Sequence, residues 1–431
     1  MRDVIIVGAG FCGLSAAQWL VARGVDAVVI EARERVGGRV EARENALGER
    51  IDTGGQFLCE DMPQIMALAR RKGRRLVEAW ADGSVVTQPS MPEEDAERVY
   101  AETGTIRLRL RDLDPADPAI RRLSVADWLA RQPEDRDARN AFRSTIEGLW
   151  CQPIDRVPLW YLADNDRRIT NRVSELQLFP VDTMHAMAAD IAAELGDRVR
   201  LAEPAERIER DEAGVRVLTE RGQWRARCAI VAVPPVAASR IAHSPALPDP
   251  LRQALGAWSS GTVVKMRLRY DKPFWRERGL CGMVVWLQPH GLFACDSSSD
   301  ADHAALTVFV GGPLAVAWAP LGETGLEEEV LRRLVAALGP KAGAPIDISP
   351  RDWTDDRWSG GGYSDVIVDL DARDAEATLR EGVWPVFFAA SELSPSFPGY
   401  VEGAIVAGRL VAERALAALS QSPIATSASG S

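Results

Sequence analysis

Three glycines near the start of the chain have the spacing of a phosphate-binding turn: Gly8, Gly10 and Gly13. In such a turn the first glycine permits a tight bend, the second lets backbone approach a pyrophosphate, and the third lets a helix pack closely on a strand. The start of that helix offers free N–H groups and a partial positive charge. Glu31 ends the next predicted strand, where a carboxylate can accept hydrogen bonds from ribose hydroxyls. Together these residues predict a dinucleotide site.

The elements that would hold this site form a predicted βαβ unit. Asp3 to Val7 predicts a buried strand, Leu14 to Arg23 a helix with Gly24 as its C-cap, and Ala27 to Ile30 a second buried strand. Later segments predict a helix over 184–195, strands over 229–233, 261–270 and 384–390, and a closing helix over 400–419. Nucleotide-type elements at the beginning, middle and end therefore predict one discontinuous domain that a second domain interrupts twice.

Composition limits the classes of function. The chain has 431 residues, more than one hydrophobic core usually serves, and its 46% hydrophobic and 26% charged residues are ordinary for a soluble protein. A formal net charge of -11 makes nucleic acid an unsuitable partner. The six cysteines are scattered and show no metal-ligand spacing with the four histidines, which indicates a reducing compartment and no metal site. Without a leader or a long apolar run we expect a cytoplasmic protein with no integral membrane segment.

Segments at both ends of the chain carry a family resemblance. EARERVGGRV begins at Glu31, WTDDRWSGGGYSD begins at Trp353, and FFAASELSPSFPGYVEGAIVAGRLVAERAL begins at Phe387. The first and last resemble the opening and closing FAD motifs of the flavin-containing monoamine oxidases, and the middle one resembles a segment in which a cysteine can be joined covalently to the flavin. Here Gly362 stands in place of that cysteine, so the resemblance implies non-covalent FAD. A further departure is Ala390-Ser391-Glu392 at the closing motif.

The resemblance implies an α/β fold with two domains. We expect a Rossmann-like FAD-binding domain over 1–76, 180–254 and 356–419, a mixed-sheet and helix substrate domain over 77–179 and 255–355, and a disordered tail over 420–431. The expected cofactor-binding residues, some from the glycine motif and some from the resemblance, are Gly8, Gly10, Phe11, Cys12, Gly13, Glu31, Ala32, Arg33, Gly38, Arg39, Gly54, Gly55, Gln56, Phe57, Ala205, Trp353, Glu392, Tyr400 and Val401.

The substrate side of the flavin depends on three residues. Strand alternation over 263–270 places Lys265 on the face opposite Val264 and Met266, and the resemblance makes it the lysine that holds a water near flavin N5. We expect burial to depress its pKa. Tyr363 and Tyr400 match the two tyrosines of an aromatic cage in front of the flavin. Glu175, Trp150 and Trp160 are weaker candidates. Glu175 could attract a second amino group of the substrate or lie on a surface loop, and the second interpretation is favoured. Trp150 and Trp160 could form cavity walls, but core packing explains either tryptophan equally well.

The predicted reaction is oxidation of a small or medium amine, with hydride transfer from its α-carbon to the flavin and O₂ as acceptor, giving H₂O₂. An L-amino-acid oxidase, or a dehydrogenase using another electron acceptor, is the main alternative, and a desaturase or a catalytically silent flavoprotein is a remote one. The sequence leaves the oligomeric state open, a homodimer included.

Overall fold

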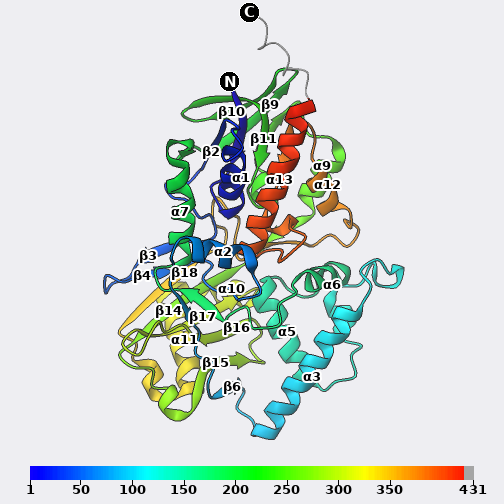
Figure 1. Cartoon of the computed structure of the whole chain (residues 1–431). Coiled ribbons are helices and arrows are strands. Elements are labelled where there is room, and N and C mark those ends of the chain that lie inside the picture. The colour runs from blue at the N-terminus through cyan, green and yellow to red at the C-terminus, as the bar shows by residue number, and fades with distance from the viewer. Residues whose placement is uncertain (422–431) are drawn as a thin grey trace, which may run out of the picture.

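The computed structural model describes residues 1–421, which form two large sheets and three two-stranded ones with helices packed around them (Figure 1). The upper part in Figure 1 contains both the N-terminal strand and the last helix, α13 (Val401–Gln421), and the lower part contains most of the middle of the chain. Residues 420 and 421 of the predicted tail are therefore helical, and 422–431 lie outside the described residues.

The larger sheet collects strands from distant parts of the chain. In it β1 pairs in parallel with β2 and β11, and β11 pairs in parallel with β20. The strands of this sheet are β1 (Arg2–Val7), β2 (Ala27–Ile30), β8 (Val199–Arg200), β9 (Ala205–Asp211), β10 (Gly214–Thr219), β11 (Gly222–Val231), β12 (Ala242–Ser244) and β20 (Val386–Phe388).

Both faces of its central strands are buried, as the continuous apolar runs predict. Along β1, Ile5 and Val7 join one core cluster, whereas Val4 and Ile6 join another on the opposite face. The first face packs against α9 (Asp249–Gly256) and α12 (Ala375–Glu381), and the second against α1 (Phe11–Val21), α2 (Pro63–Arg71), α7 (Met184–Leu195) and α13. This is a three-layer α/β arrangement, and it brings the glycine turn between β1 and α1 to the edge of the sheet that faces the lower part (Figure 1).

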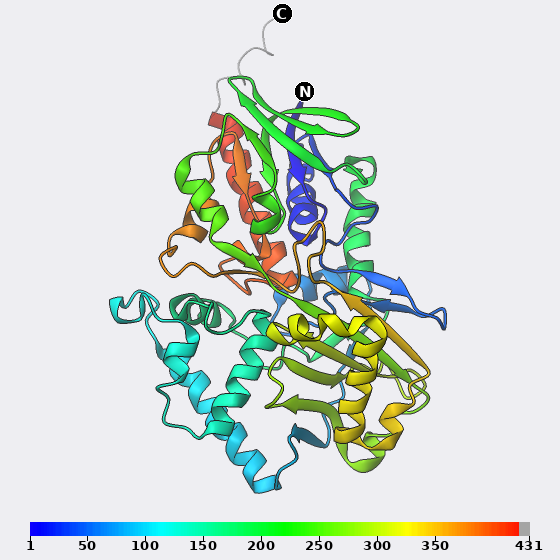
Figure 2. The ribbon, with the colours of Figure 1, turned by 180° about the vertical axis from the view of Figure 1, so that it is seen from behind.

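The second sheet carries Lys265. Its order is β18 (Asp347–Asp352), β14 (Val263–Tyr270), β17 (Ala304–Gly311), β16 (Leu292–Asp296), β15 (Leu280–Trp286) and β6 (Ser84–Gln88). Val264, Met266 and Leu268 of β14 pack on one face against α10 (Pro313–Trp318) and α11 (Gly322–Leu338), the yellow helices of Figure 2. The predicted alternation of β14 is confirmed, and it leaves Lys265 on the face away from these helices.

Of the helices beside this sheet, α5 (Arg136–Trp150) contacts β15, β16 and β17. α3 (Glu93–Asp112) packs against α5 and α6 (Leu159–Arg168), and α4 (Val125–Leu129) packs against α6. The other short strands and helices include β3 (Ala42–Glu44), β4 (Arg50–Asp52), β5 (Leu76–Glu78), β7 (Leu178–Pro180), α8 (Pro235–Ala238), β13 (Trp258–Ser260) and β19 (Asp365–Ile367). β5 pairs with β7, so the proposed domain limits at 76/77 and 179/180 fall within two paired strands. Among the helices of residues 1–421, none has the length and apolar character needed to cross a bilayer.

Most predicted elements are present with shifted ends. α1 begins at Phe11 and ends at Val21, with Ala22 as C-cap, so it starts and stops earlier than its composition indicated. Gly24, at φ 80°, lies in the loop that follows. β11 stops at Val231, since the next residues turn into Pro234 and α8.

Candidate active site

A cavity of about 640 Å³ lies between the two sheets and connects the glycine turn to the aromatic side chains near β14. Its wall includes nearly all of the predicted site residues, from widely separated parts of the chain. They are Gly8, Gly10, Phe11, Cys12, Glu31, Ala32, Arg33, Gly38, Arg39, Gly54, Gly55, Gln56, Phe57, Trp150, Glu175, Ala205, Lys265, Trp353, Tyr363, Tyr400 and Val401. Gly13, Glu392 and Trp160 were also predicted for the site but do not line this cavity.

The three glycines of the turn have different neighbours. A Cβ on Gly8 would lie 2.8 Å from the Ala232 carbonyl oxygen, and φ at Gly8 is 105°. A Cβ on Gly13 would lie 1.9 Å from the Gly8 carbonyl oxygen. At Gly10, by contrast, a Cβ would meet no atom within 4 Å. Folding alone therefore requires Gly8 and Gly13, whereas Gly10 opens onto the cavity, where a ligand can approach the backbone.

Glu31 is held at the cavity edge by backbone amides. Its Oε2 accepts from the Ala9 N–H (2.7 Å) and its Oε1 from the Arg33 N–H (2.9 Å). Burial raises the pKa of Glu31, and these two N–H groups oppose the rise. Each carboxylate oxygen retains a second lone pair, so the predicted contact with ribose hydroxyls remains sterically and chemically open.

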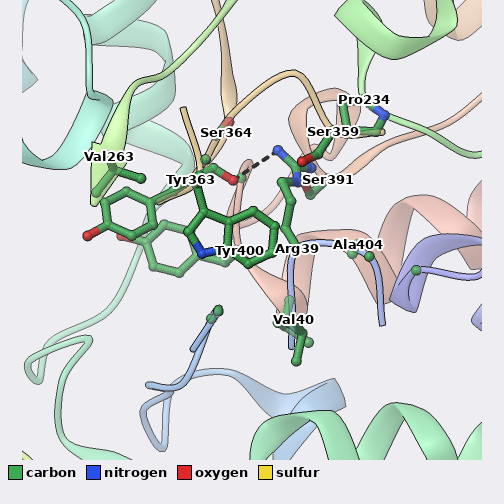
Figure 3. Close-up of a pocket in the computed structure, with 18 of the residues that line it drawn as sticks. Arg39, Val40, Pro234, Val263, Ser359, Tyr363, Ser364, Ser391, Tyr400 and Ala404 are labelled. Atoms are coloured by element: carbon green, nitrogen blue, oxygen red, sulfur yellow. Dashed lines mark hydrogen bonds between the residues drawn. The ribbon is translucent and has the colours of Figure 1, made fainter. Parts of the chain in front are cut away.

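Arg39 joins three motifs that are far apart in sequence. Its Nη2 donates to Glu392 Oε2 (3.1 Å) and Ser391 Oγ (3.0 Å), and its Nη1 donates to the Tyr363 carbonyl oxygen (2.9 Å; Figure 3). The carboxylate of Glu392 is fully buried, and Arg39 lowers its pKa against the effect of burial. The second N–H of Nη1 donates to Glu392 Oε1. Only the Nε–H of Arg39 is then left for the predicted phosphate contact, which stays a prediction. Glu392 does not line the cavity itself; it binds Arg39, which does.

Two of the three glycines in WSGGGY are required by close packing within the protein, which the sequence did not show. A Cβ on Gly360 would lie 2.4 Å from Ser260 Oγ, and one on Gly361 would lie 2.1 Å from the Gly261 carbonyl oxygen. Of the three glycines only Gly362 lines the cavity. Gly360 and Gly361 are therefore needed for packing against the residues just before β14.

Lys265 is buried and fully hydrogen-bonded. Its Nζ donates to the carbonyl oxygens of Asp52 (2.8 Å) and Gly54 (2.8 Å) and to Gln56 Oε1 (2.9 Å). Burial lowers the pKa of Lys265 to about 8, while the Asp52 carboxylate raises it. The expected direction is confirmed. An ammonium has three protons, so a water at Nζ must displace one acceptor, and the Gln56 side chain is the one that can rotate away.

Tyr363 and Tyr400 lie at the same end of the cavity, and their hydroxyls point away from Arg39 and Ala404 (Figure 3). The Tyr363 ring packs edge-on against Phe309, with centroids 5.7 Å apart, and the Tyr400 ring packs edge-on against Phe397 at 6.0 Å. Burial raises the pKa of both phenols well above the usual value. Both side chains therefore stay neutral and present aromatic faces and hydroxyls to the cavity.

The three weaker candidates, Trp150, Trp160 and Glu175, lie in different surroundings. Trp150 lines the cavity, but Trp160 packs in the core, where its Nε1–H donates to the Leu370 carbonyl oxygen (3.0 Å). Glu175 is half-buried in a turn and lines the cavity, so a role in the cavity and the favoured interpretation as a surface-loop residue both stay predictions. The faint resemblance around these residues gave no signal that could rank the three.

Comparison with known proteins identifies the family to which the chain belongs. The family model described as "Flavin containing amine oxidoreductase" matches residues 11–416. The chain belongs to the flavin-containing amine oxidoreductases.

Relatives with known names and solved structures match this chain over nearly all of its length. An L-amino acid dehydrogenase of Synechocystis is 29% identical, covering 95% of this chain and 94% of its own. Cyclohexylamine oxidase from Brevibacterium oxydans has a similar structure, with a TM-score of 0.89, 29% identity and coverage of 97% of this chain and 100% of its own. A putrescine oxidase bound to putrescine gives a TM-score of 0.89 at 28% identity, with 96% and 99% covered. The predicted fold class and a flavin-dependent enzyme that acts on amines are thus confirmed.

The residues of this amine oxidoreductase fit a flavin nucleotide. Gly10 leaves an open cradle next to the first turn of α1, whose N-cap provides no side-chain acceptor for the free amides. At the other end Val401 lines the cavity as the first residue of α13, before the first intrahelical bond from Ala404 N–H to the Tyr400 carbonyl oxygen (3.0 Å). Two helix N-termini thus face one cavity, and both favour negative charge on a ligand.

An ion-pair network beside the cavity was not predicted from the sequence. Asp356 accepts from Arg33 and, through Oδ2, from Arg351 Nη2 (2.8 Å), and Arg351 Nε donates to Glu41 Oε1 (2.9 Å). The guanidinium of Arg351 also stacks 4.0 Å from the Trp353 ring. The network ties the FAD-motif segment after β2 to β18 and to the segment that leads into WSGGGY. Single charged residues in turns gave no local pattern that could have identified it.

Proposed function

We propose that this chain binds FAD non-covalently and oxidises a small or medium amine at the C–H bond next to nitrogen. One observation carries the proposal: a single cavity joins the Gly10 cradle to Lys265, Tyr363 and Tyr400. A bound flavin would accept the hydride and pass the electrons to O₂, giving H₂O₂, while the resulting imine is hydrolysed by water.

The chain's own residues would then orient the amine and exclude water. Tyr363 and Tyr400 would hold the substrate nitrogen between their rings, whose negative faces attract a polarised or cationic group. Lys265 would place a polar hydrogen or a bound water at the same end of the cavity, with Gln56 as the exchangeable partner. Because most amines are protonated at neutral pH, the rate should rise with pH through the pKa of the bound amine.

Gly362 supports the non-covalent mode. It lines the cavity where the resemblance places a cysteine in covalent relatives, and it has no thiol. A Cβ at Gly362 would lie 3.1 Å from Val263 Cγ1 and 3.3 Å from Trp353 Cβ, so this part of the wall is closely packed without any side chain. The flavin should therefore be held by the cradle, the helix N-termini and the polar groups around Glu31.

A second candidate function is oxidation of an L-amino acid, with or without O₂ as acceptor. The relative from Synechocystis is an L-amino acid dehydrogenase, and Arg107 of α3 lines the cavity as a cation that a carboxylate would need. Arg107 already donates to Asp166 Oδ1 (3.1 Å), however, and Arg111 donates to the other oxygen of Asp166 (3.2 Å). A substrate carboxylate would have to compete with this pair, which favours amines.

The test is anaerobic mixing of the flavin-loaded protein with separate amines and amino acids, following the loss of flavin absorbance. Amines should bleach the flavin, and readmitted air should restore the absorbance with formation of H₂O₂. Bleaching by amino acids alone would move the assignment to the second candidate, and slow recovery in air would indicate another electron acceptor. A flat rate across the alkaline limb at saturating substrate would contradict the need for a neutral amine.

We also propose a cytoplasmic location. All six cysteines are buried and free, which fits a reducing compartment.

A further inference from the structure

Glu175 stands out among the charged groups of the cavity. It lies in the loop between α6 and β7, half-buried, and lines the same cavity as Lys265 and Tyr400. Within residues 1–421 its carboxylate accepts no hydrogen bond and takes part in no ion pair. A carboxylate that faces a cavity without a partner in the protein keeps its acceptor oxygens available for a bound cation.

Most other charged side chains around the cavity are compensated by the protein. The exceptions are the exposed cations Arg240 and Arg357, which form no ion pair within residues 1–421. Lys265 has three oxygen acceptors, Glu31 has two amide donors, and the arginines that form ion pairs are Arg33 with Asp356, Arg39 with Glu392 and Arg107 with Asp166. Asp166 also binds Arg111, so Arg107 is not free to swing towards Glu175 without leaving its own partner. Glu175 therefore offers an uncompensated negative charge on the substrate side.

This charge acts close to the proposed cage. Burial is the main cause of the raised pKa of the Tyr400 phenol, and the Glu175 carboxylate is the next cause, ahead of the opposing Arg107. The next residue in the chain, Leu176, also lines the cavity, and so do the apolar side chains of Leu292 and Phe293. In such surroundings a carboxylate attracts a cation more strongly than it would in water.

The reaction sets a second requirement. Hydride can leave only from an amine whose nitrogen is neutral, whereas a carboxylate beside the cage stabilises an ammonium. A monoamine satisfies one of these conditions at the expense of the other. A molecule with two amino groups satisfies both, because one nitrogen can stay charged against Glu175 while the other is neutral at the reacting position.

We propose that Glu175 binds a second ammonium group of the substrate and that the substrate class is aliphatic diamines. The inference rests on the proposed amine oxidation, and it assigns to Glu175 a role in specificity. The carboxylate would form a charge-assisted hydrogen bond with the distal ammonium and would repel a substrate carboxylate at the same place.

The test compares cadaverine, n-pentylamine and δ-aminovalerate, which share one chain length and differ at the distal end. The rates of flavin bleaching and kcat/KM are measured for the wild type, Glu175→Gln and Glu60→Gln. Glu60 is the matched control, because it is an exposed acid near Cys59, whose pKa it raises as Glu175 does, yet it does not line the cavity. Flavin content and thermal unfolding are recorded for each variant.

We expect the wild type to prefer cadaverine to n-pentylamine and to disfavour δ-aminovalerate. Glu175→Gln should lower the ratio of kcat/KM for cadaverine over n-pentylamine roughly tenfold or more, mainly through KM, as for a lost charge-assisted hydrogen bond. Glu60→Gln should keep the ratio of the wild type. Equal ratios in the wild type and Glu175→Gln, or a wild type that prefers n-pentylamine, would overturn the inference. If neither amine bleached wild-type flavin, the proposed function itself would fail.

Discussion

Replacing Gly10 by alanine should separate cofactor binding from folding. The added Cβ meets no protein atom within 4 Å, and the backbone at Gly10, with φ −73° and ψ 175°, suits any L-residue. Removing this glycine should therefore stabilise the flavin-free protein by about 0.4–1 kcal/mol, through the unfolded chain. At roughly 2 cal/mol/K of unfolding entropy per residue, such a gain raises the Tm of a chain this long by only about 1 °C.

Flavin binding should change in the opposite direction. The methyl group would occupy the cradle beside the first turn of α1, where overpacking typically costs about 1–3 kcal/mol. Since about 1.4 kcal/mol corresponds to a factor of ten, the Kd for FAD should rise roughly fivefold to a hundredfold. The measurement is titration of flavin-free protein with FAD, followed by flavin fluorescence, together with thermal unfolding of the flavin-free form.

Gly13→Ala is the matched control. Its Cβ would lie 1.9 Å from the Gly8 carbonyl oxygen, so it should destabilise the flavin-free protein itself. The reasoning would be refuted if Gly10→Ala bound FAD as tightly as the wild type, or if its flavin-free form lost stability as Gly13→Ala does.

Three further predictions concern buried charges and the flavin linkage. Glu392→Ala should lower the free energy of unfolding by about 3–5 kcal/mol, because it leaves buried Arg39 without its carboxylate partner. Arg332→Gln, at an exposed ion pair, should change it by less than about 0.5 kcal/mol. Similar Tm shifts in the two variants would contradict this prediction. Burial lowers the pKa of Lys265 from 10.5 to about 8, so between these pH values the folded state binds fewer protons than the unfolded chain. The stability of the wild type relative to Lys265→Met should therefore rise with pH across that window. Chemical denaturation measures this difference, and a fall with pH would contradict the prediction. Acid precipitation should release the yellow cofactor into the supernatant, and flavin retained in the pellet would refute the interpretation of Gly362.

Local patterns were sufficient for the elements around the cofactor. The βαβ unit was predictable because apolar runs, a glycine turn and a helix cap act within a few residues, and β14 was predictable because its alternation is regular. The direction of the Lys265 pKa shift followed once the resemblance had placed that lysine in a dry site. The ends of α1 and β11 were less predictable, because turns and prolines beyond the run decide where hydrogen bonding stops.

The compensation of charge was not predictable in the same way. Arg39 and Glu392 are 353 residues apart in sequence, and nothing local to either one indicates that each neutralises the other. The same holds for Arg33, Asp356 and Arg351, which look like ordinary charged turn residues until the fold brings them together. These pairs are properties of the tertiary arrangement, and they explain why Arg33 and Arg39 do not by themselves make the cavity an anion site.

Glu175 illustrates the consequence for function. Its residue type was visible in the sequence, but a carboxylate selects a cation only if no arginine or lysine of the protein satisfies it first. That condition depends on Asp166, which holds both Arg107 and Arg111 from α3, and on the three oxygens that occupy Lys265. Substrate selectivity in this cavity therefore follows from which charges the fold leaves without a partner. An Asp166→Asn variant should release Arg107 and weaken the preference for cadaverine without any change at Glu175, whereas an unchanged preference would show that Arg107 does not reach Glu175.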